Sequence, residues 1–207
     1  GKPEEVTQFI RDNAKYYSKV AAILTPMSKA LSTESANQIT YDCIQIHGGT
    51  GYMHDFDAER YYRDARITNI YEGTTQLQFV AAIGGVMQRV LDSYITQLFE
   101  KIPADALIGR LKKLIREMHE KHLETVKFVA DKKSTSYHDL RAKNLVENET
   151  FIFVGLLMLR DACKDASREP LAERYILDAV HDFDRNYKTI LCDDLPTIDR
   201  HREVIDY

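Results

Sequence analysis

Apolar residues recur at intervals of three and four along nearly the whole chain, and this periodicity restricts the fold more than any other feature. In the first stretch the recurring residues on one helical face include Phe9, Tyr16, Val20 and Leu24. Helices are expected over residues 4–31, with a bend near Pro26, and over 33–47, with Gly48 as a left-handed terminator. Because only nine glycines and five prolines interrupt 207 residues, we predict an all-α protein.

The next segment combines a short helix with irregular chain. A charged helix is expected over residues 57–66, and residues 67–71 are expected to be irregular or extended. Thr75 and Gln78 have the spacing of a capping box, in which each side chain accepts from the backbone N–H of the other residue. The sequence therefore predicts a long helix from Thr75 to about Phe99.

A proline that follows a short break divides the chain into two predicted domains. We expect a helical bundle over residues 1–100 and a second helical bundle over residues 101–207. Three helices are expected in the second bundle, over residues 105–132, 136–167 and 170–191. Ser136 is expected to cap the middle helix, and the apolar run 151–159 predicts that this helix is buried on most of its circumference.

Composition excludes several classes of function. With 28 Lys and Arg against 32 Asp and Glu, the net charge is −4, so the chain lacks the basic excess of nucleic-acid binders. Three widely spaced cysteines give neither a disulfide framework nor a zinc motif. The longest uncharged run, residues 73–88, is too short and too polar for a membrane span. His119 and His122 have metal-ligand spacing without a third ligand nearby, so we interpret them as a solvated polar face and predict no metal site.

Two short segments carry the residues best suited to chemistry. One reads Gln45-Ile46-His47-Gly48-Gly49-Thr50-Gly51-Tyr52, and adjacent glycines after a helix let a ligand approach the backbone. The other reads Tyr71-Glu72-Gly73-Thr74-Thr75-Gln76 and places a carboxylate just before a helix N-terminus. Taken singly, each has a simpler structural interpretation, a glycine-stopped helix in one case and a dipole-compensating surface glutamate in the other. The functional alternative is a general base beside a glycine that admits substrate.

The two segments and the block between them together resemble the C-terminal helical domain of the acyl-CoA dehydrogenases. The intervening block is Glu59-Arg60-Tyr61-Tyr62-Arg63-Asp64-Ala65-Arg66, and the order and spacing of all three blocks match over about residues 1–95. Residues 101–207 look like the additional helical domain of some bacterial members. The resemblance implies an FAD-dependent enzyme that oxidises an acyl-CoA to a 2-enoyl-CoA. A base would remove the α-proton while FAD takes a hydride from the β-carbon.

The resemblance also implies roles for individual residues. Glu72 is expected to be the catalytic base, with its backbone N–H holding the thioester carbonyl. Tyr71 and Gly73 are expected to bind the acyl-CoA substrate. The residues expected to bind FAD are Gln45, Gly48, Gly49, Thr74, Thr75 and Gln76, of which the first three would reach the FAD of a neighbouring subunit.

The same resemblance predicts a fragment of a homo-oligomeric enzyme, either a dimer or a tetramer. Family members also have an N-terminal helical domain and a β-domain, so we expect this chain to be a C-terminal fragment that neither retains FAD nor acts alone. The intact enzyme is expected in the bacterial cytoplasm, with an electron-transfer flavoprotein as partner. Two alternatives stay open, an acyl-CoA oxidase fragment and a non-catalytic helical oligomerisation scaffold. The sequence indicates neither the acyl chain length nor a role for residues 101–207.

Overall fold

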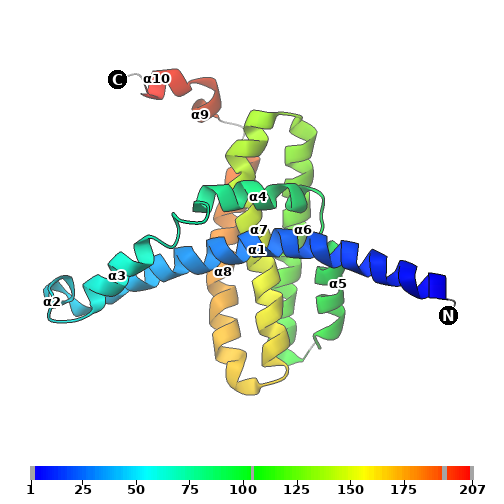
Figure 1. The fold of residues 1–207 in the computed structure, drawn as a ribbon, viewed down its shortest axis with the longest axis horizontal. Helices are drawn as coiled ribbons and strands as arrows, with labels where there is room; N and C mark the ends of the chain where they lie inside the picture. The colour runs from blue at the N-terminus through cyan, green and yellow to red at the C-terminus, as the bar shows by residue number, and fades with distance from the viewer. Residues whose placement is uncertain (1–2, 104, 193–194, 206–207) are drawn as a thin grey trace. The chain divides into compact units, whose positions relative to one another are not determined.

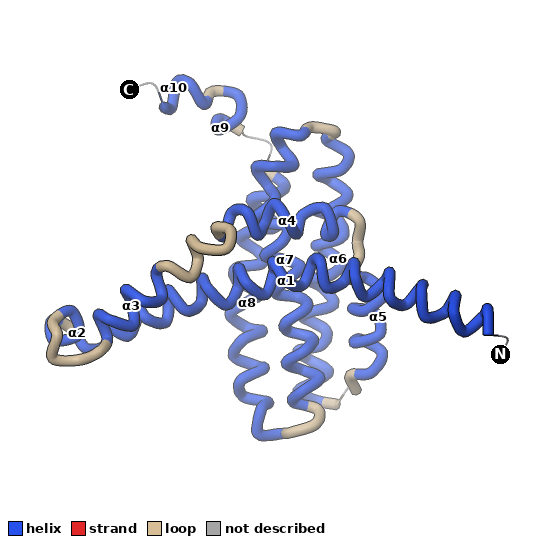
Figure 2. Tube along the Cα trace, in the orientation of Figure 1, coloured by secondary structure: helices blue, strands red, loops and turns tan. Residues whose placement is uncertain are grey.

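All the regular secondary structure in the described part of this protein is helical (Figures 1 and 2). The computed structural model describes residues 3–103, 105–192 and 195–205. In chain order the elements are α1 (Pro3–His47), α2 (Gly49–Tyr52), α3 (Ala58–Arg66), α4 (Thr75–Met87), α5 (Asp92–Lys101), α6 (Ala106–Lys132), α7 (Thr135–Ala162), the 3₁₀ helix η1 (Ala166–Arg168), α8 (Glu169–Leu191), α9 (Pro196–Asp199) and α10 (His201–Ile205). The predicted all-α fold is confirmed. Among the described residues, no helix is both long enough and apolar enough to cross a bilayer.

The helices pack into two compact units, which we call unit 1 (Gly1–Ala82) and unit 2 (Ile83–Tyr207). In unit 1, α2 and α3 both pack on α1, and Figure 1 shows α3 beside the C-terminal part of that helix. In unit 2, α7 packs against α5, α6 and α8. These are packing units, and separately folding domains over residues 1–100 and 101–207 stay a prediction.

The prediction of separate helices over residues 4–31 and 33–47 is wrong, because α1 runs unbroken from Pro3 to His47, with Pro26 inside it. A proline inside a helix removes one hydrogen bond and costs about 3 kcal/mol. Here Ile23 and Met27 beside the proline are both buried, and burial of one such side chain contributes about 1.5–3 kcal/mol. The helix therefore continues because its buried face extends on both sides of the proline.

The predicted helix over residues 75–99 is also wrong, because it breaks between Met87 and Asp92. Arg89 has a φ of 56°, in the left-handed region, and its Nε donates to Asp92 Oδ2 at 2.5 Å. The Asp92 carboxylate also lies in the first turn of α5, where the helix dipole favours negative charge. A local ion pair thus stabilises a turn that apolar periodicity does not reveal.

The burial predicted for the middle helix of unit 2 is confirmed in α7. Ile152, Leu156 and Leu159 have no exposed surface. The predicted cap was misplaced by two residues, because Ser134 rather than Ser136 accepts from the N–H of Tyr137, at 3.2 Å.

Unit 2 also buries polar side chains. The interpretation of the two α6 histidines as a solvated face is wrong, because His122 is only 3% exposed and burial lowers its pKa to about 3. On α7, burial raises the pKa of Glu149 to about 8, with a smaller contribution from the Asp92 carboxylate. Within the described residues, no cluster of His, Cys, Asp and Glu has the arrangement to hold a metal ion.

Candidate active site

The loop that carries Glu72 is fixed to α1 and to α4 by side chains. Residues 67–71 form turns, as predicted for irregular chain. From α1, Lys29 Nζ donates to the backbone carbonyls of Tyr71, at 2.8 Å, and Gly73, at 2.5 Å. From α4, Gln78 Nε2 donates to the carbonyls of Glu72, at 3.2 Å, and Gly73, at 3.1 Å. Three successive carbonyls of the loop are therefore held by donors from two helices.

A second anchor ties the end of the same loop to α1. The Glu34 carboxylate accepts from the Thr75 hydroxyl and from Asn69 Nδ2, the latter at 3.1 Å. The predicted capping box is therefore wrong, because Thr75 binds another helix instead of its own. Thr74 takes the capping place, and its Oγ1 accepts from the N–H of Leu77 at 3.4 Å.

Glu72 has an unusual backbone conformation and two unpaired polar groups. Its φ is 53°, and the left-handed region costs a residue with a side chain about 1–2 kcal/mol. The side chain is exposed. Within the described part of the chain, neither its carboxylate nor its backbone N–H has a hydrogen-bond partner. Both groups are therefore available to a ligand, and such strain is often associated with functional sites.

Two features favour glycine at position 73. Its φ is 93°, which side chains disfavour, and a Cβ there would lie 2.8 Å from Gln78 Nε2. The neighbouring site residues are more open, because Tyr71, Thr74 and Gln76 are exposed while Thr75 is half-buried.

The glycine-rich segment lies at the C-terminal end of α1. Gly48 has φ 62° and ψ −146°, so the positive φ was predicted correctly but the residue is not in the left-handed helical region. A Cβ at Gly48 or Gly49 would meet nothing within 4 Å, whereas one at Gly51 would lie 2.5 Å from His47 Cβ. The backbone of the first two glycines is thus open to a ligand, and Gly51 allows α2 to pack on α1.

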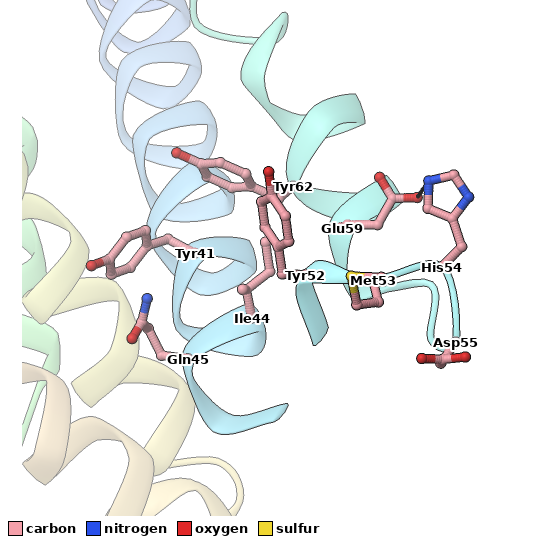
Figure 3. Close-up of a pocket in the computed structure, with 9 residues that line it drawn as sticks. All are labelled: Tyr41, Ile44, Gln45, Tyr52, Met53, His54, Asp55, Glu59 and Tyr62. Carbon is pink, nitrogen blue, oxygen red and sulfur yellow. Dashed lines mark ion pairs between the residues drawn. The ribbon is translucent and has the colours of Figure 1, made fainter. Parts of the chain in front are cut away.

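A cavity of about 760 Å³ lies beside this segment, between α1, α3 and the chain after α2 (Figure 3). Its walls carry three tyrosines, and Tyr41 and Tyr62 meet edge to face with ring centroids 6.3 Å apart. Of the predicted site residues, Gln45 alone lines it. The lining residues are Tyr41, Ile44, Gln45, Tyr52, Met53, His54, Asp55, Glu59 and Tyr62.

The structure brings residues 71–76 together in one loop and the first turn of α4. This region lies far from the glycine-rich segment. Lys29, which contacts the loop, and Gln45 are 16 residues apart on α1, so they are separated by about 24 Å along the helix axis. One chain therefore presents two separate candidate surfaces in unit 1.

The sequence analysis missed Lys29 and Glu34 as anchors of the Glu72 loop, and it predicted Gln78 only as part of a capping box. Lys29, Glu34 and Gln78 lie outside both motifs. The contacts of Lys29 span 42 and 44 residues. No local pattern signals such a pair, and only the fold shows that they meet.

Two family models match successive parts of the chain. The family model described as "Acyl-CoA dehydrogenase, C-terminal domain" matches residues 11–86, and the one described as "Acyl-CoA dehydrogenase C terminal" matches residues 92–191. The chain belongs to the acyl-CoA dehydrogenase family, as the sequence resemblance predicted.

Individual relatives show how much of a complete protein the chain represents. The mitochondrial short-chain specific acyl-CoA dehydrogenase of Bos taurus is 44% identical over 79 residues, which are 38% of this chain and 18% of that protein. The caffeyl-CoA reductase–Etf complex subunit CarC of Acetobacterium woodii is 39% identical over 80 residues, which are 39% of this chain and 20% of that protein. The chain thus spans about a fifth of the length of the curated relatives that it matches.

A solved structure supports the fold. The crystal structure of an acyl-CoA dehydrogenase complexed with FAD from Bacillus anthracis superimposes with a TM-score of 0.66 at 19% sequence identity. The superposition covers 80% of this chain and 32% of that chain. At this identity the match shows a shared fold.

Proposed function

We propose that this chain is the C-terminal part of an FAD-dependent acyl-CoA dehydrogenase and that Glu72 is the base that removes the α-proton of an acyl-CoA. The observation that carries the proposal is the geometry at Glu72. Among the described residues, the carboxylate and the backbone N–H of Glu72 both lack a hydrogen-bond partner, on a loop whose carbonyls are held by Lys29 and Gln78. The names of the relatives support a CoA thioester as the substrate.

The two free groups of Glu72 suit the chemistry of a thioester. An α-proton is too weakly acidic for a carboxylate to remove unaided, so the carbonyl that receives the developing negative charge needs a hydrogen bond. The N–H of Glu72 would donate to that carbonyl while its carboxylate takes the proton. Bound FAD supplies the acceptor for the hydride that leaves the β-carbon.

The residues proposed for FAD fit a bound cofactor. The backbone of Gly48 and Gly49 is open, and the Gln45 side chain is exposed one turn earlier. Near Glu72 we propose Thr74, Thr75 and Gln76, although the Thr75 hydroxyl already donates to Glu34 and would act only as an acceptor. The separation of the two segments along α1, about 24 Å, supports the proposal that the glycine segment contacts the FAD of a neighbouring subunit in a homo-oligomer.

The electron acceptor separates this proposal from its nearest alternative. We propose a bacterial cytoplasmic enzyme that passes electrons to an electron-transfer flavoprotein. The Etf in the name of the Acetobacterium woodii relative supports this proposal. An acyl-CoA oxidase would instead pass the electrons from its reduced FAD to oxygen. Rapid reoxidation of the reduced full-length protein by oxygen would favour the oxidase.

Glu72→Gln in the full-length protein tests the proposed base. It keeps the size of the side chain but cannot accept the proton, so turnover should fall by about 100- to 10,000-fold with FAD content unchanged. Glu100→Gln changes another exposed glutamate and should leave turnover intact. Wild-type turnover of Glu72→Gln would favour the scaffold interpretation or a base elsewhere.

A separate measurement tests whether the 207-residue chain acts as a fragment. The flavin absorbance of the purified chain should show no stoichiometric FAD, because the proposed contacts lie on two separate surfaces of unit 1. A stoichiometric flavin spectrum would contradict this part of the proposal.

A further inference from the structure

We infer that Lys29 is a positioning residue for Glu72. The ammonium group of Lys29 holds the carbonyls of Tyr71 and Gly73, the residues on either side of the base. The inference rests on the proposed function, because it assigns a role to Lys29 through Glu72. Lys29 lies on α1, more than 40 residues before the loop, and neither sequence motif includes it.

The contacts of Lys29 form a clamp around one residue. Its Nζ donates to Tyr71 O at 2.8 Å and to Gly73 O at 2.5 Å, so the bonded carbonyls belong to the residues directly before and after Glu72. The ammonium also lies 5.6 Å from the centre of the Tyr71 ring, within the range of a cation–π contact. Among the described residues, Lys29 alone binds both flanking carbonyls.

This clamp acts on the backbone torsions that set the direction of the base. The Tyr71 carbonyl shares a peptide plane with the Glu72 N–H, so Lys29 fixes the plane that includes the N–H proposed to hold the thioester. The bond to Gly73 O fixes the plane that follows Gly73, while Gln78 holds the plane between Glu72 and Gly73. Glu72 has a φ of 53°, and an unrestrained loop would relax towards a negative φ. Such a relaxation rotates the carboxylate and the N–H away from a shared substrate.

The charge of Lys29 distinguishes it from the other anchors of the loop. A hydrogen bond from a charged donor is stronger than one between neutral groups. Gln78 is neutral, its bonds are longer, at 3.1 and 3.2 Å, and it does not reach the Tyr71 carbonyl. Glu34 holds only Asn69 and Thr75, on either side of this position. Loss of Lys29 therefore frees the Tyr71 carbonyl, which no other side chain holds among the described residues.

The kinetic test uses the full-length flavoprotein with Lys29→Met, which keeps the length of the side chain but removes the donors. Because misplacement of a reacting group by about 1 Å can cost a factor of 100, kcat should fall by about 10- to 100-fold. The KM for acyl-CoA should stay within about twofold, and the isotope effect with α-deuterated substrate should rise. Lys29→Arg, which can donate to both carbonyls, should recover part of the lost kcat. Lys19→Met, at an exposed lysine of the same helix, should match the wild type.

A second readout does not depend on activity. In the 207-residue chain, amide hydrogen exchange of peptides covering residues 70–76 should be faster in Lys29→Met than in the wild type. Peptides covering residues 45–52 should be unchanged, because that segment lies about 24 Å along α1. An unchanged exchange rate in residues 70–76 would show that Lys29 does not hold the loop.

The outcomes separate this inference from the proposed function. Wild-type turnover in Glu72→Gln overturns the base assignment, whatever Lys29 does. Loss of turnover in Glu72→Gln, together with wild-type kcat and isotope effect in Lys29→Met, overturns the positioning role alone. If Lys29→Met fails to bind FAD, Lys29→Gln takes its place, and the same comparison of kcat with KM decides. A rise in KM with kcat unchanged would also overturn the inference, because it indicates substrate binding instead of placement of the base.

Discussion

Unit 1 and unit 2 differ in which side chains they leave at the surface. Among the described residues, 15 of the 18 exposed large hydrophobic side chains lie in unit 1, whereas 27 of the 34 buried hydrophobic residues lie in unit 2. All seven buried polar or charged residues also lie in unit 2. Unit 2 therefore has a core of its own, whereas the apolar surface of unit 1 is typical of a region that other protein surfaces cover.

The comparison extends to the proposed chemistry. Glu72 and Gly73, which have positive φ, and the open glycines 48 and 49 all lie in unit 1. Unit 2 instead encloses several polar groups, among them His122 and Glu149. Unit 1 thus presents groups that a ligand could bind, whereas unit 2 contributes most of the buried hydrophobic core.

Deletion of core volume should have the largest effect and should separate the two units. Leu156→Ala in α7 removes a side chain with no exposed surface and should lower the free energy of unfolding by about 2–5 kcal/mol. Leu77→Ala in α4 removes a side chain that is 57% exposed and should change it by less than about 0.5 kcal/mol. Urea unfolding of the 207-residue chain measures both free energies. Equal losses in Leu156→Ala and Leu77→Ala would contradict the difference in burial between the two sites.

The buried charges of unit 2 should make its stability depend on pH. Glu149 has a pKa of about 8 in the folded protein against an ordinary value of 4.5. Between these values the folded state holds the extra proton, so stability falls as pH rises. His122 has a pKa of about 3 against an ordinary value of 6.5, so its contribution rises with pH between those values. The two effects offset each other between pH 4.5 and 6.5, which leaves a net loss between pH 6.5 and 8.

Glu149→Gln tests that loss. Wild-type stability should fall by about 2 kcal/mol between pH 6.5 and 8, at about 1.4 kcal/mol per pH unit, whereas the variant should be nearly flat. Glu117→Gln, at an exposed site on α6, should keep the wild-type slope. Thermal unfolding across this range is the measurement, and the same slope in all three proteins would show that Glu149 is not the cause.

Gly73→Ala should weaken the Glu72 loop of unit 1. The φ of 93° and a Cβ only 2.8 Å from Gln78 Nε2 predict a loss of about 1–3 kcal/mol. Gly84→Ala is the matched control, because it lies in helix α4 with nothing within 4 Å of its Cβ, and it should be neutral or slightly stabilising. Hydrogen exchange and thermal unfolding measure both, and an unchanged loop in Gly73→Ala would contradict the predicted strain.

The smallest expected effect concerns the N-terminus of α7 in unit 2. Ser134→Ala removes the acceptor for the N–H of Tyr137 and should lower the free energy of unfolding by about 1 kcal/mol. Ser136→Ala, inside the helix and exposed, should be neutral or slightly stabilising. If Ser136→Ala lowered the free energy of unfolding more than Ser134→Ala, Ser136 would be the cap, as the sequence predicted.

The sequence predicted elements whose signals are local. The charged helix α3 and the ends of α6 and α8 agree with the prediction within one or two residues, because periodicity and capping residues lie within each helix. Predictions failed near residue 32, where α1 continues without a break, and at Arg89, where a local ion pair outweighs helix propensity. The sequence motif predicted Glu72 as a site residue. Lys29 was missed because its partners are more than 40 residues away in the sequence.

The most direct test of the central claim is an anaerobic single turnover of the full-length flavoprotein. Wild-type protein and Glu72→Gln would be mixed with acyl-CoAs of increasing chain length, and oxidised-flavin absorbance would be followed. We predict that the best substrate bleaches the wild-type flavin rapidly, while Glu72→Gln still binds that acyl-CoA but stays oxidised over the same period. Bleaching of Glu72→Gln at the wild-type rate would contradict the assignment of Glu72 as the base.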